Sequence, residues 1–383
     1  MTLAEQLDRK DDPMQIPSPN PAMTTKDVIE TLRASGKPVS EWGRSIDGTP
    51  MLAARSGGDK QPPIFITAGA HATETAGVHA ALNLLHMLDT EHEVHILPLR
   101  DPLGFAGVNH CLSFAAGKQV DVPDTDAALN YLLSHGQLIW QEGEMVVVKL
   151  GNVGFAWHPL RPDLESYWEI FTRIGKTARD EPALLRPLWG CSVMMVNSVS
   201  GVEGSGAMER CWHALLTAQA EWLHLNRLFG RDDAPPEVGA VERLMQAVRP
   251  GLTCDLHEGN GAGFWMPIPR PNENAERVFE MTRAYFDYIH IRGYPITTYE
   301  NWLATDRTGA RDPNWMSPEP RLPGLFWCTS LLRGEGPNLM DRARLYGIGY
   351  GTEAPMQRPL AMRVDGITHG ILAAIRVWEA TIE

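Results

Sequence analysis

Residues 62–78 read PPIFITAGAHATETAGV, and they join a strand pattern, two polar residues and a helix pattern. The apolar, β-branched first half predicts a short buried strand. His71 and Glu74 follow it directly, and apolar residues at helical spacing over 74–88 predict a helix. A second strand is predicted over 93–99, which reads EVHILPL. Strand, helix and strand in this order are typical of a parallel sheet with crossover helices.

The rest of the pattern predicts one α/β domain over 1–383, with 1–25 as an N-terminal extension. An Asp47-Gly48 turn indicates a hairpin before the first core strand. The strand–helix order breaks over about 105–205, which we interpret as an insertion that contains the hairpin QLIWQEGEMVVVKLG and the helix LESYWEIFTRIGKTA. We therefore expect a mixed, mostly parallel, twisted sheet flanked by helices on both faces, with a large insertion.

Composition restricts the classes of partner and of site. The 383 residues carry a formal net charge of −13 and no lysine- or arginine-rich run, which argues against nucleic acid or a membrane surface as partner. No apolar stretch could span a bilayer, and no secretory signal precedes the fold. The five cysteines form no Cys-x-x-Cys pair, so they indicate reduced thiols rather than disulfides or a thiolate zinc site. We expect a cytoplasmic protein acting on a small molecule or short peptide, and a homo-oligomer remains possible.

His71 and Glu74 form the one His-x-x-Glu pattern of the sequence. Thirteen histidines and an ordinary glutamate frequency give about one such pattern by chance, so the pattern alone carries no information. Its position is informative, because open α/β sheets bind ligands where their strands end. The two residues are either metal ligands at the mouth of a sheet or an accident of composition.

A third ligand is expected from another strand end. His257 lies at the end of the predicted strand LTCDLH, and two imidazoles with one carboxylate leave a fourth position open for water, as in a catalytic zinc site. Asp255 lies two residues earlier, on the same side of a strand, where it could orient a ligand. Taken alone, His257 is more simply a buried core histidine, and Asp255 a buried, paired carboxylate.

Two further positions carry groups suited to hydrolysis. Glu353 follows the glycine-rich strand YGIGYGT, and a carboxylate there could take a proton from water; its plain alternative is a solvated glutamate at a strand end. Arg227, next to Asn226, offers a planar fork that can bind a carboxylate in two places. Its plain alternative is a surface ion pair. Each of these signals is weak singly.

In their order along the chain, these motifs resemble the zinc carboxypeptidase family, including its deacylase relatives of the aspartoacylase and succinylglutamate desuccinylase type. VSEWGRSIDGTPM resembles the family's first strands, GAHATE its ligand motif and LPLRDPLGF its proline-rich turn. HLNRLF resembles the substrate motif, DLH the third ligand and GTEAP the catalytic glutamate. The likeness covers about 38–110 and 205–383.

The resemblance implies one zinc ion, bound by His71, Glu74 and His257. It also implies that Glu353 is the general base, which later protonates the leaving amine. The implied reaction is hydrolysis of an amide or peptide bond next to a carboxylate-bearing group.

The same resemblance implies a set of substrate contacts. Asn226 and Arg227 would hold the substrate carboxylate, and an upstream arginine would polarise the scissile carbonyl. Arg210, in MERCWH, is the expected polarising residue, and His213 competes for that role because the match there is loose.

Two departures from the family pattern stand out. His224 occupies the place of an aspartate that usually supports the first zinc histidine, and loss of such support typically costs about 10- to 100-fold in metal affinity or activity. Another group must then orient His71, or the site is weakened. The insertion is the second departure, and its tryptophans either wall an aromatic pocket or form its own core. They are Trp140, Trp157, Trp168 and Trp189.

Three functions stay open on the sequence alone. A carboxypeptidase would grip a C-terminal carboxylate with Arg227, whereas a deacylase would act on a small N-acylated amino acid or related metabolite. A binding protein would keep the fold without catalysis, which Glu353 argues against and His224 argues for. The cytosolic composition favours a small, specific substrate over protein digestion.

Overall fold

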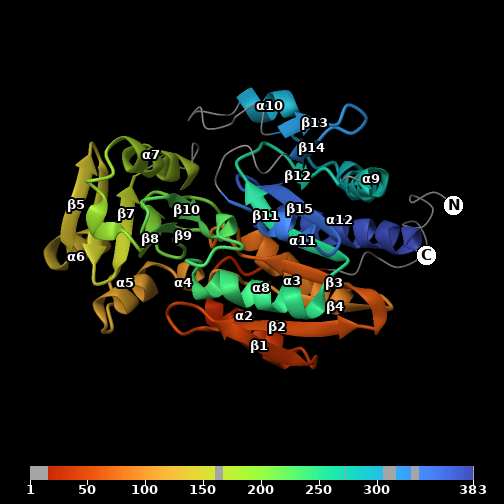
Figure 1. Ribbon diagram of the computed structural model, residues 1–383, viewed down its shortest axis with the longest axis horizontal. Coiled ribbons are helices and arrows are strands. Elements are labelled where there is room, and N and C mark those ends of the chain that lie inside the picture. Colours follow the sequence, from red (N-terminus) through yellow and green to blue (C-terminus); the bar gives the residue numbers. More distant parts are fainter. Residues whose placement is uncertain (1–15, 160–166, 272, 305–315, 329–335, 383) are drawn as a thin grey trace.

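Two large sheets lie next to each other in the molecule, and helices pack against both of them (Figure 1). The computed structural model describes residues 16–159, 167–271, 273–304, 316–328 and 336–382. The expectation of a mixed α/β fold whose sheets are flanked by helices is confirmed. None of the helices in these ranges is long and apolar enough to cross a membrane.

The first sheet, called the main sheet below, has six strands in the order β1-β2-β4-β3-β11-β15. Their bounds are β1 Val39–Arg44, β2 Pro50–Gly57, β3 Lys60–Ala68, β4 His92–Leu97, β11 Leu252–Gly259 and β15 Ile348–Pro355. The pairs β4–β3, β3–β11 and β11–β15 are parallel, whereas β1–β2, the predicted hairpin, and β2–β4 are antiparallel. Because parallel neighbours run in one direction, β3, β11 and β15 end at the same edge of the sheet.

Helices cover both faces of the main sheet. Ile64 and Ile66 of β3 pack with α3, α9 and α12 on one face, and Phe65 packs with α8 and α11 on the other. The bounds of these helices are α3 Thr75–Met87, α8 Pro236–Val248, α9 Ala275–Ile291, α11 Leu339–Ala343 and α12 Leu360–Thr381. Side chains alternate across a strand, so all three strand residues are fully buried although they are consecutive. This double burial explains why β3 reads as a continuous apolar run.

The second sheet also has six strands, in the order β10-β9-β8-β7-β6-β5. Their bounds are β5 Gln137–Glu142, β6 Met145–Leu150, β7 Val153–His158, β8 Cys191–Asn197, β9 Trp212–Leu216 and β10 Trp222–His224. β7 and β8 are parallel and the other pairs are antiparallel, so the predicted hairpin is present as β5–β6. The sheet runs from Gln137 to His224, past the expected insertion end near 205, because β9 pairs with β8 and β10 with β9.

The second sheet has a core of its own on each face. One face packs against α5 and α6, and the other packs against α7, which includes residues 167–178 of the helix predicted over 164–178; residues 164–166 lie outside the described residues. The bounds are α5 Val108–Ala116, α6 Thr125–His135 and α7 Tyr167–Asp180. Met194 and Met195 of β8 illustrate the alternation, since the first belongs to the α5–α6 core and the second to the α7 core. The segment is therefore a complete two-faced layer rather than an isolated hairpin and helix.

A third, three-stranded sheet lies beside the end of β15 (Figure 1). Its strands are β12 Met266–Pro269, β14 Leu325–Cys328 and β13 Met316–Pro318, and the remaining elements are α2 Thr25–Ala34, α4 Pro102–Phe105, α10 Tyr299–Ala304 and short 3-10 helices at Arg186–Leu188 and Leu225–Arg227. Trp265, just before β12, exchanges two backbone hydrogen bonds with Glu353, with N–O distances of 3.0 and 2.9 Å. This pairing fixes the backbone of Glu353 from the side opposite β11.

Candidate metal centre

His71 and Glu74 lie in the short connection between β3 and α3. Gly69 leaves the strand with φ +62°, a conformation that glycine adopts without steric cost. Glu74 then stands immediately before the first residue of α3. The turn brings the two side chains together, with 2.6 Å between His71 Nδ1 and Glu74 Oε1.

His257, near the end of β11, completes a buried cluster. Its Nδ1 lies 2.7 Å from Oε2 of Glu74, so the carboxylate sits between two imidazoles. The candidate ligand atoms of His71, Glu74 and His257 all lie within 4.8 Å of one another, and each residue is 5% exposed. Two imidazole nitrogens and a carboxylate are the donor set of a catalytic zinc site, and their convergence fits that ion.

A carboxylate supports the outer nitrogen of His257. His257 Nε2 lies 2.9 Å from Asp255 Oδ2, and Asp255 in turn accepts a 2.6 Å hydrogen bond from Arg100. Burial opposes protonation of His257, but Asp255 and Glu74 outweigh it and hold the pKa of His257 well above its ordinary value. Burial likewise acts to raise the pKa of Asp255, yet Arg100 and His257 keep that pKa below its usual range.

An imidazole, not a carboxylate, supports the outer nitrogen of His71. His71 Nε2 lies 2.9 Å from Nδ1 of His224, the last residue of β10. Burial outweighs the attraction of Glu74 and lowers the pKa of His71. Burial also lowers the pKa of His224, which is 1% exposed. The two candidate histidine ligands therefore have opposite electrostatic surroundings.

The four tryptophans of the expected insertion have separate places. Trp168 of α7 packs at the candidate site, with its ring centroid 6.3 Å from that of His71 and 5.2 Å from that of His224. Trp157 is buried in the core between β7 and the α5–α6 layer, and Trp189 is 38% exposed. Trp140 lines a different cavity, described below. Only Trp168 of these four therefore contacts the cluster.

Glu353 lies next to the cluster on β15, directly opposite His257 in the register of β11 and β15. The residue is half-buried, but its Oε2 is buried and has no hydrogen-bond partner among the described residues. Burial, followed by repulsion from Glu74, raises the pKa of Glu353 well above its ordinary value. Gly259 leaves room for this carboxylate, because a Cβ there would lie 2.8 Å from Glu353 Oε2. An unpartnered carboxylate oxygen beside the ligand set is a second observation that fits a bound cation and water.

Asn226 is buried within the site. Its Oδ1 accepts from Arg100 and from the backbone of Leu339, and its Nδ2 lies near Asp255 and His257, at distances of 3.2 to 3.4 Å. These four contacts occupy both hydrogens and both acceptor positions of the amide. Asn226 is therefore held among Arg100, Asp255 and His257, and its substrate contact stays a prediction. Neighbouring Arg227 is half-buried, and its Nη1 donates to the carbonyl of Asn226 at 2.9 Å.

The contacts of Arg210 lie outside the cluster. Its guanidinium donates to the carbonyls of Met23, Phe105 and Glu209 at 2.6 to 3.1 Å, and burial lowers its pKa to about 10. None of these partners belongs to the cluster, and the carbonyls direct the guanidinium towards α4 and the segment before α2. The structure therefore joins Arg210 to these carbonyls and not to the cluster, and its polarising role stays a prediction.

The competing residue His213 is also directed elsewhere. It lies on β9 between Asp101 and Ser192, with 3.3 Å from Nδ1 to Asp101 Oδ1 and 2.8 Å from Nε2 to Ser192 Oγ. All three side chains are almost fully buried. A serine, histidine and aspartate thus meet as in a hydrolase triad, but a substrate could not reach the hydroxyl. The group links the loop after β4 to the second sheet.

Arg100 is the residue that sequence reasoning missed. It is 4% exposed and bridges Asp255 and Asn226, the two residues that support His257. The sequence pattern could have indicated Arg100 as a site residue, because it directly follows the predicted strand EVHILPL, at the sheet edge where ligands bind. A buried arginine at such a point requires an anionic partner.

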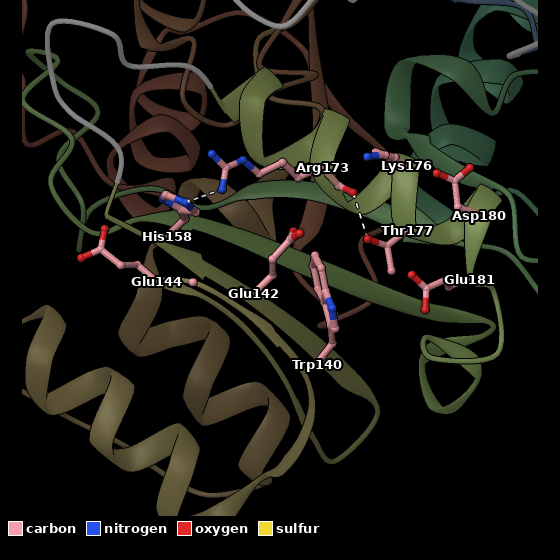
Figure 2. A pocket seen from close by; sticks show the side chains of 10 residues that line it. Trp140, Glu142, Glu144, His158, Arg173, Lys176, Thr177, Asp180 and Glu181 are labelled. Carbon is pink, nitrogen blue, oxygen red and sulfur yellow. Dashed lines mark hydrogen bonds between the residues drawn. The ribbon is translucent and has the colours of Figure 1, made fainter.

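A separate cavity of about 690 Å³ lies on the second sheet, between β5, the end of β7 and α7. Figure 2 shows Trp140 and Glu142 of β5 opposite Arg173 and Lys176 of α7. The lining residues are Trp140, Glu142, Gly143, Glu144, His158, Arg173, Lys176, Thr177, Asp180 and Glu181. None of them belongs to the metal cluster.

No protein-family model and no curated protein matches the sequence. Among solved structures, the chain is similar to a metallo-carboxypeptidase from Burkholderia cenocepacia (12% identity, 94% of this chain and 70% of that one, TM-score 0.47). It is also similar to a metallo-carboxypeptidase from Pseudomonas aeruginosa in complex with (2-guanidinoethylmercapto)succinic acid (11%, 94% and 69%, TM-score 0.46). A third is bovine thrombin-activatable fibrinolysis inhibitor in complex with tick carboxypeptidase inhibitor (10%, 94% and 98%, TM-score 0.46).

Two of these three structures are metallo-carboxypeptidases by their descriptions. At such low identities and TM-scores, they assign neither a family nor a residue role to this chain.

Proposed function

We propose that the chain is a zinc-dependent hydrolase that cleaves an amide or peptide bond next to a carboxylate-bearing group. The observation that carries this proposal is the buried cluster in which Nδ1 of His71 and Nδ1 of His257 face the carboxylate of Glu74. A zinc ion held by these residues would supply Lewis acidity, which polarises a carbonyl and lowers the pKa of a water ligand to about 7.

Glu353 would move the protons of the reaction. Its unpartnered Oε2 would accept a proton from the attacking water and return it to the leaving amine, a contribution typically worth about 10²- to 10⁴-fold in rate. The backbone bonds from Trp265 and the pairing of β15 with β11 hold the residue beside His257. Because its backbone is fixed in this way, Glu353 would already be oriented for proton transfer.

The other residues would orient the site and the substrate. Arg227 would bind the substrate carboxylate with its planar fork. Asn226 would keep His257 and Arg100 in place through its four contacts, so its contribution to binding would be indirect. The substrate would be a small molecule or short peptide with a carboxylate, as the sequence predicts.

A second candidate activity is removal of an acyl group from a small N-acylated amino acid or related compound. The three ligand residues are each 5% exposed, and the ring centroid of Trp168 lies 6.3 Å from that of His71. A ligand set that is buried this deeply would favour a compact molecule over a protein chain.

The proposal is tested by Glu353→Gln, which removes the base but keeps the size of the side chain. We expect turnover to fall by about 10²- to 10⁴-fold while zinc content stays equal to that of the wild type. Glu30→Gln, at an exposed position on α2, is the matched control and should have no effect. Unchanged turnover in Glu353→Gln would remove the proposed base.

The substrate class is decided by a parallel screen of two panels. One panel measures release of C-terminal amino acids from short peptides, and the other measures hydrolysis of N-acylated amino acids. Activity on the first panel supports a carboxypeptidase, and activity confined to the second supports a deacylase. A zinc-loaded protein that hydrolyses neither panel but binds carboxylate ligands would be the non-catalytic alternative.

A further inference from the structure

The two ring nitrogens of His71 face different groups. Nδ1 lies 2.6 Å from the carboxylate of Glu74, on the side of the proposed ion, and Nε2 lies 2.9 Å from Nδ1 of His224. A neutral imidazole has one donor and one acceptor nitrogen, and a nitrogen that binds a metal must be unprotonated. If Nδ1 binds the ion, Nε2 carries the hydrogen. Nδ1 of His224 must then be the acceptor of that hydrogen bond.

His224 is buried among aromatic side chains. The residue is 1% exposed, and its Nε2 has no hydrogen-bond partner among the described residues. Three aromatic rings surround it, with centroids 5.2 to 5.6 Å from its own. They are Trp168 and Phe171 of α7 and Trp212 of β9. Ring packing, not a hydrogen-bond network, therefore fixes the orientation of this imidazole.

The partner of His257 offers a direct comparison. Its outer nitrogen lies 2.9 Å from the carboxylate of Asp255, an acceptor with a formal negative charge. His224 offers His71 an acceptor of similar reach but without a charge, and so it adds no repulsion against Glu74 in a buried site. His224 at the end of β10, a strand of the second sheet, thereby contacts His71, which follows β3 of the main sheet.

We infer that His224 is a positioning residue for the proposed zinc site: its Nδ1 accepts the Nε2 hydrogen of His71 and so selects the tautomer whose Nδ1 can bind the metal. The inference rests on the proposed zinc function. His224 would then be the group that orients His71, at the position where the resemblance leads one to expect an aspartate. Groups that orient metal-binding histidines commonly affect metal affinity by about 10- to 100-fold.

Two substitutions separate the acceptor from the ring. His224→Phe keeps an aromatic ring among Trp168, Phe171 and Trp212 but removes the acceptor. His224→Asn loses the ring but places an amide oxygen near the position of Nδ1. In competition titrations with a chelator, we expect zinc affinity to fall by about 10- to 100-fold in His224→Phe and to remain close to wild type in His224→Asn.

A spectroscopic readout distinguishes positioning from simple packing. Visible absorption of the Co²⁺-substituted protein reports the geometry around the metal, and we expect its bands to change in His224→Phe and to be kept in His224→Asn. His158→Phe is the matched control, because His158 is a buried histidine of the same sheet that contacts Arg173 and no member of the cluster. It should leave both zinc affinity and the Co²⁺ spectrum unchanged.

Each outcome has one meaning. A folded His224→Phe protein with wild-type zinc affinity and an unchanged spectrum would overturn the inference and leave the proposed function intact. A wild-type protein that binds neither zinc nor Co²⁺ would instead contradict the proposed function. If His224→Phe does not fold, His224→Asn decides, because its amide oxygen keeps an uncharged acceptor near the position of Nδ1: zinc affinity close to wild type supports the inference, and a loss of about 10- to 100-fold would overturn it.

Discussion

The two six-stranded sheets of this protein contribute to the candidate site in unequal ways. The main sheet has three parallel pairs, so β3, β11 and β15 end at one edge and bring His71, His257 and Glu353 together. The second sheet is antiparallel except for β7 and β8, and it supplies the cluster with one hydrogen-bonding side chain, His224, and an aromatic wall. Its cavity of about 690 Å³ lies elsewhere. The shared direction of β3, β11 and β15 brings the candidate residues to one edge of the main sheet.

The largest effect is expected on the main-sheet side of this comparison, from Arg100→Met. Arg100 and Asp255 form a 2.6 Å ion pair with side chains 5% and 0% exposed. Removal of the cation breaks a buried ion pair and leaves the Asp255 carboxylate with only His257 and Asn226 as partners, and breaking such a pair typically costs about 3–5 kcal/mol. Urea unfolding should show this loss, and zinc affinity should fall because Asp255 supports His257. Arg55→Met, an exposed arginine of β2, is the control; equal stability of the two variants would contradict the prediction.

Met194→Ala tests the other side of the comparison. Met194 is fully buried in the second sheet and faces α5 and α6, away from Trp212. Loss of its side chain should reduce the free energy of unfolding by about 2–5 kcal/mol through lost burial and a cavity. Zinc affinity of the folded protein should not change. A large drop in zinc affinity with intact folding would mean that the two sheets are more strongly coupled than their contacts indicate.

Gly259→Ala tests how closely Glu353 is held. The new methyl would lie 2.8 Å from Glu353 Oε2, so the carboxylate must move by several tenths of an ångström. We expect kcat to fall by about 10- to 100-fold, since small displacements of catalytic groups have effects of this size. Zinc affinity and stability should stay near wild type. Gly239→Ala in α8, where the nearest atom is Arg243 Nη1 at 3.3 Å, serves as control, and equal kcat in both variants would rule the idea out.

The smallest effect concerns the polar link between the sheets, His213 with Asp101. Burial opposes protonation of His213, but Asp101 outweighs it, with smaller contributions from Glu237 and Asp47, and the pKa of His213 lies above its ordinary value of 6.5. A raised pKa in the folded state stabilises the protein fully below pH 6.5, and this stabilisation is lost as pH rises through the folded-state pKa. The difference in unfolding free energy between wild type and His213→Asn should therefore shrink from pH 5.5 to pH 9. A constant difference would exclude this linkage.

The sequence predicted the main sheet and the metal cluster because both depend on local patterns. The apolar run before His71 and the strand before His257 indicate where strands end, and parallel strands bring their ends together. Glu353 follows the same logic. These residues could be grouped without knowledge of any long-range side-chain contact.

The remaining features depend on contacts between distant segments. Arg210 and His213 have partners outside the cluster: Arg210 donates to backbone carbonyls of Met23, Phe105 and Glu209, and His213 lies on β9, which pairs with β8. No local sequence pattern encodes these contacts. Asn226 faces inward because Arg100 and Asp255, from β4's end and β11, occupy its amide. The sequence indicated only a hairpin and a helix of the second sheet. Its strands β7 and β8 are separated along the chain by α7, so no local pattern indicates that they pair.

The most direct measurement of the central claim is the zinc content of the purified protein after incubation with zinc and removal of free metal, determined by mass spectrometry of the element. We expect one tightly bound ion per chain in the wild type and none in His257→Ala, with His95→Ala, a histidine of β4 outside the cluster, equal to wild type. A wild-type protein without zinc, or a His257→Ala protein that keeps it, would contradict the claim that the edge of the main sheet is a metal centre.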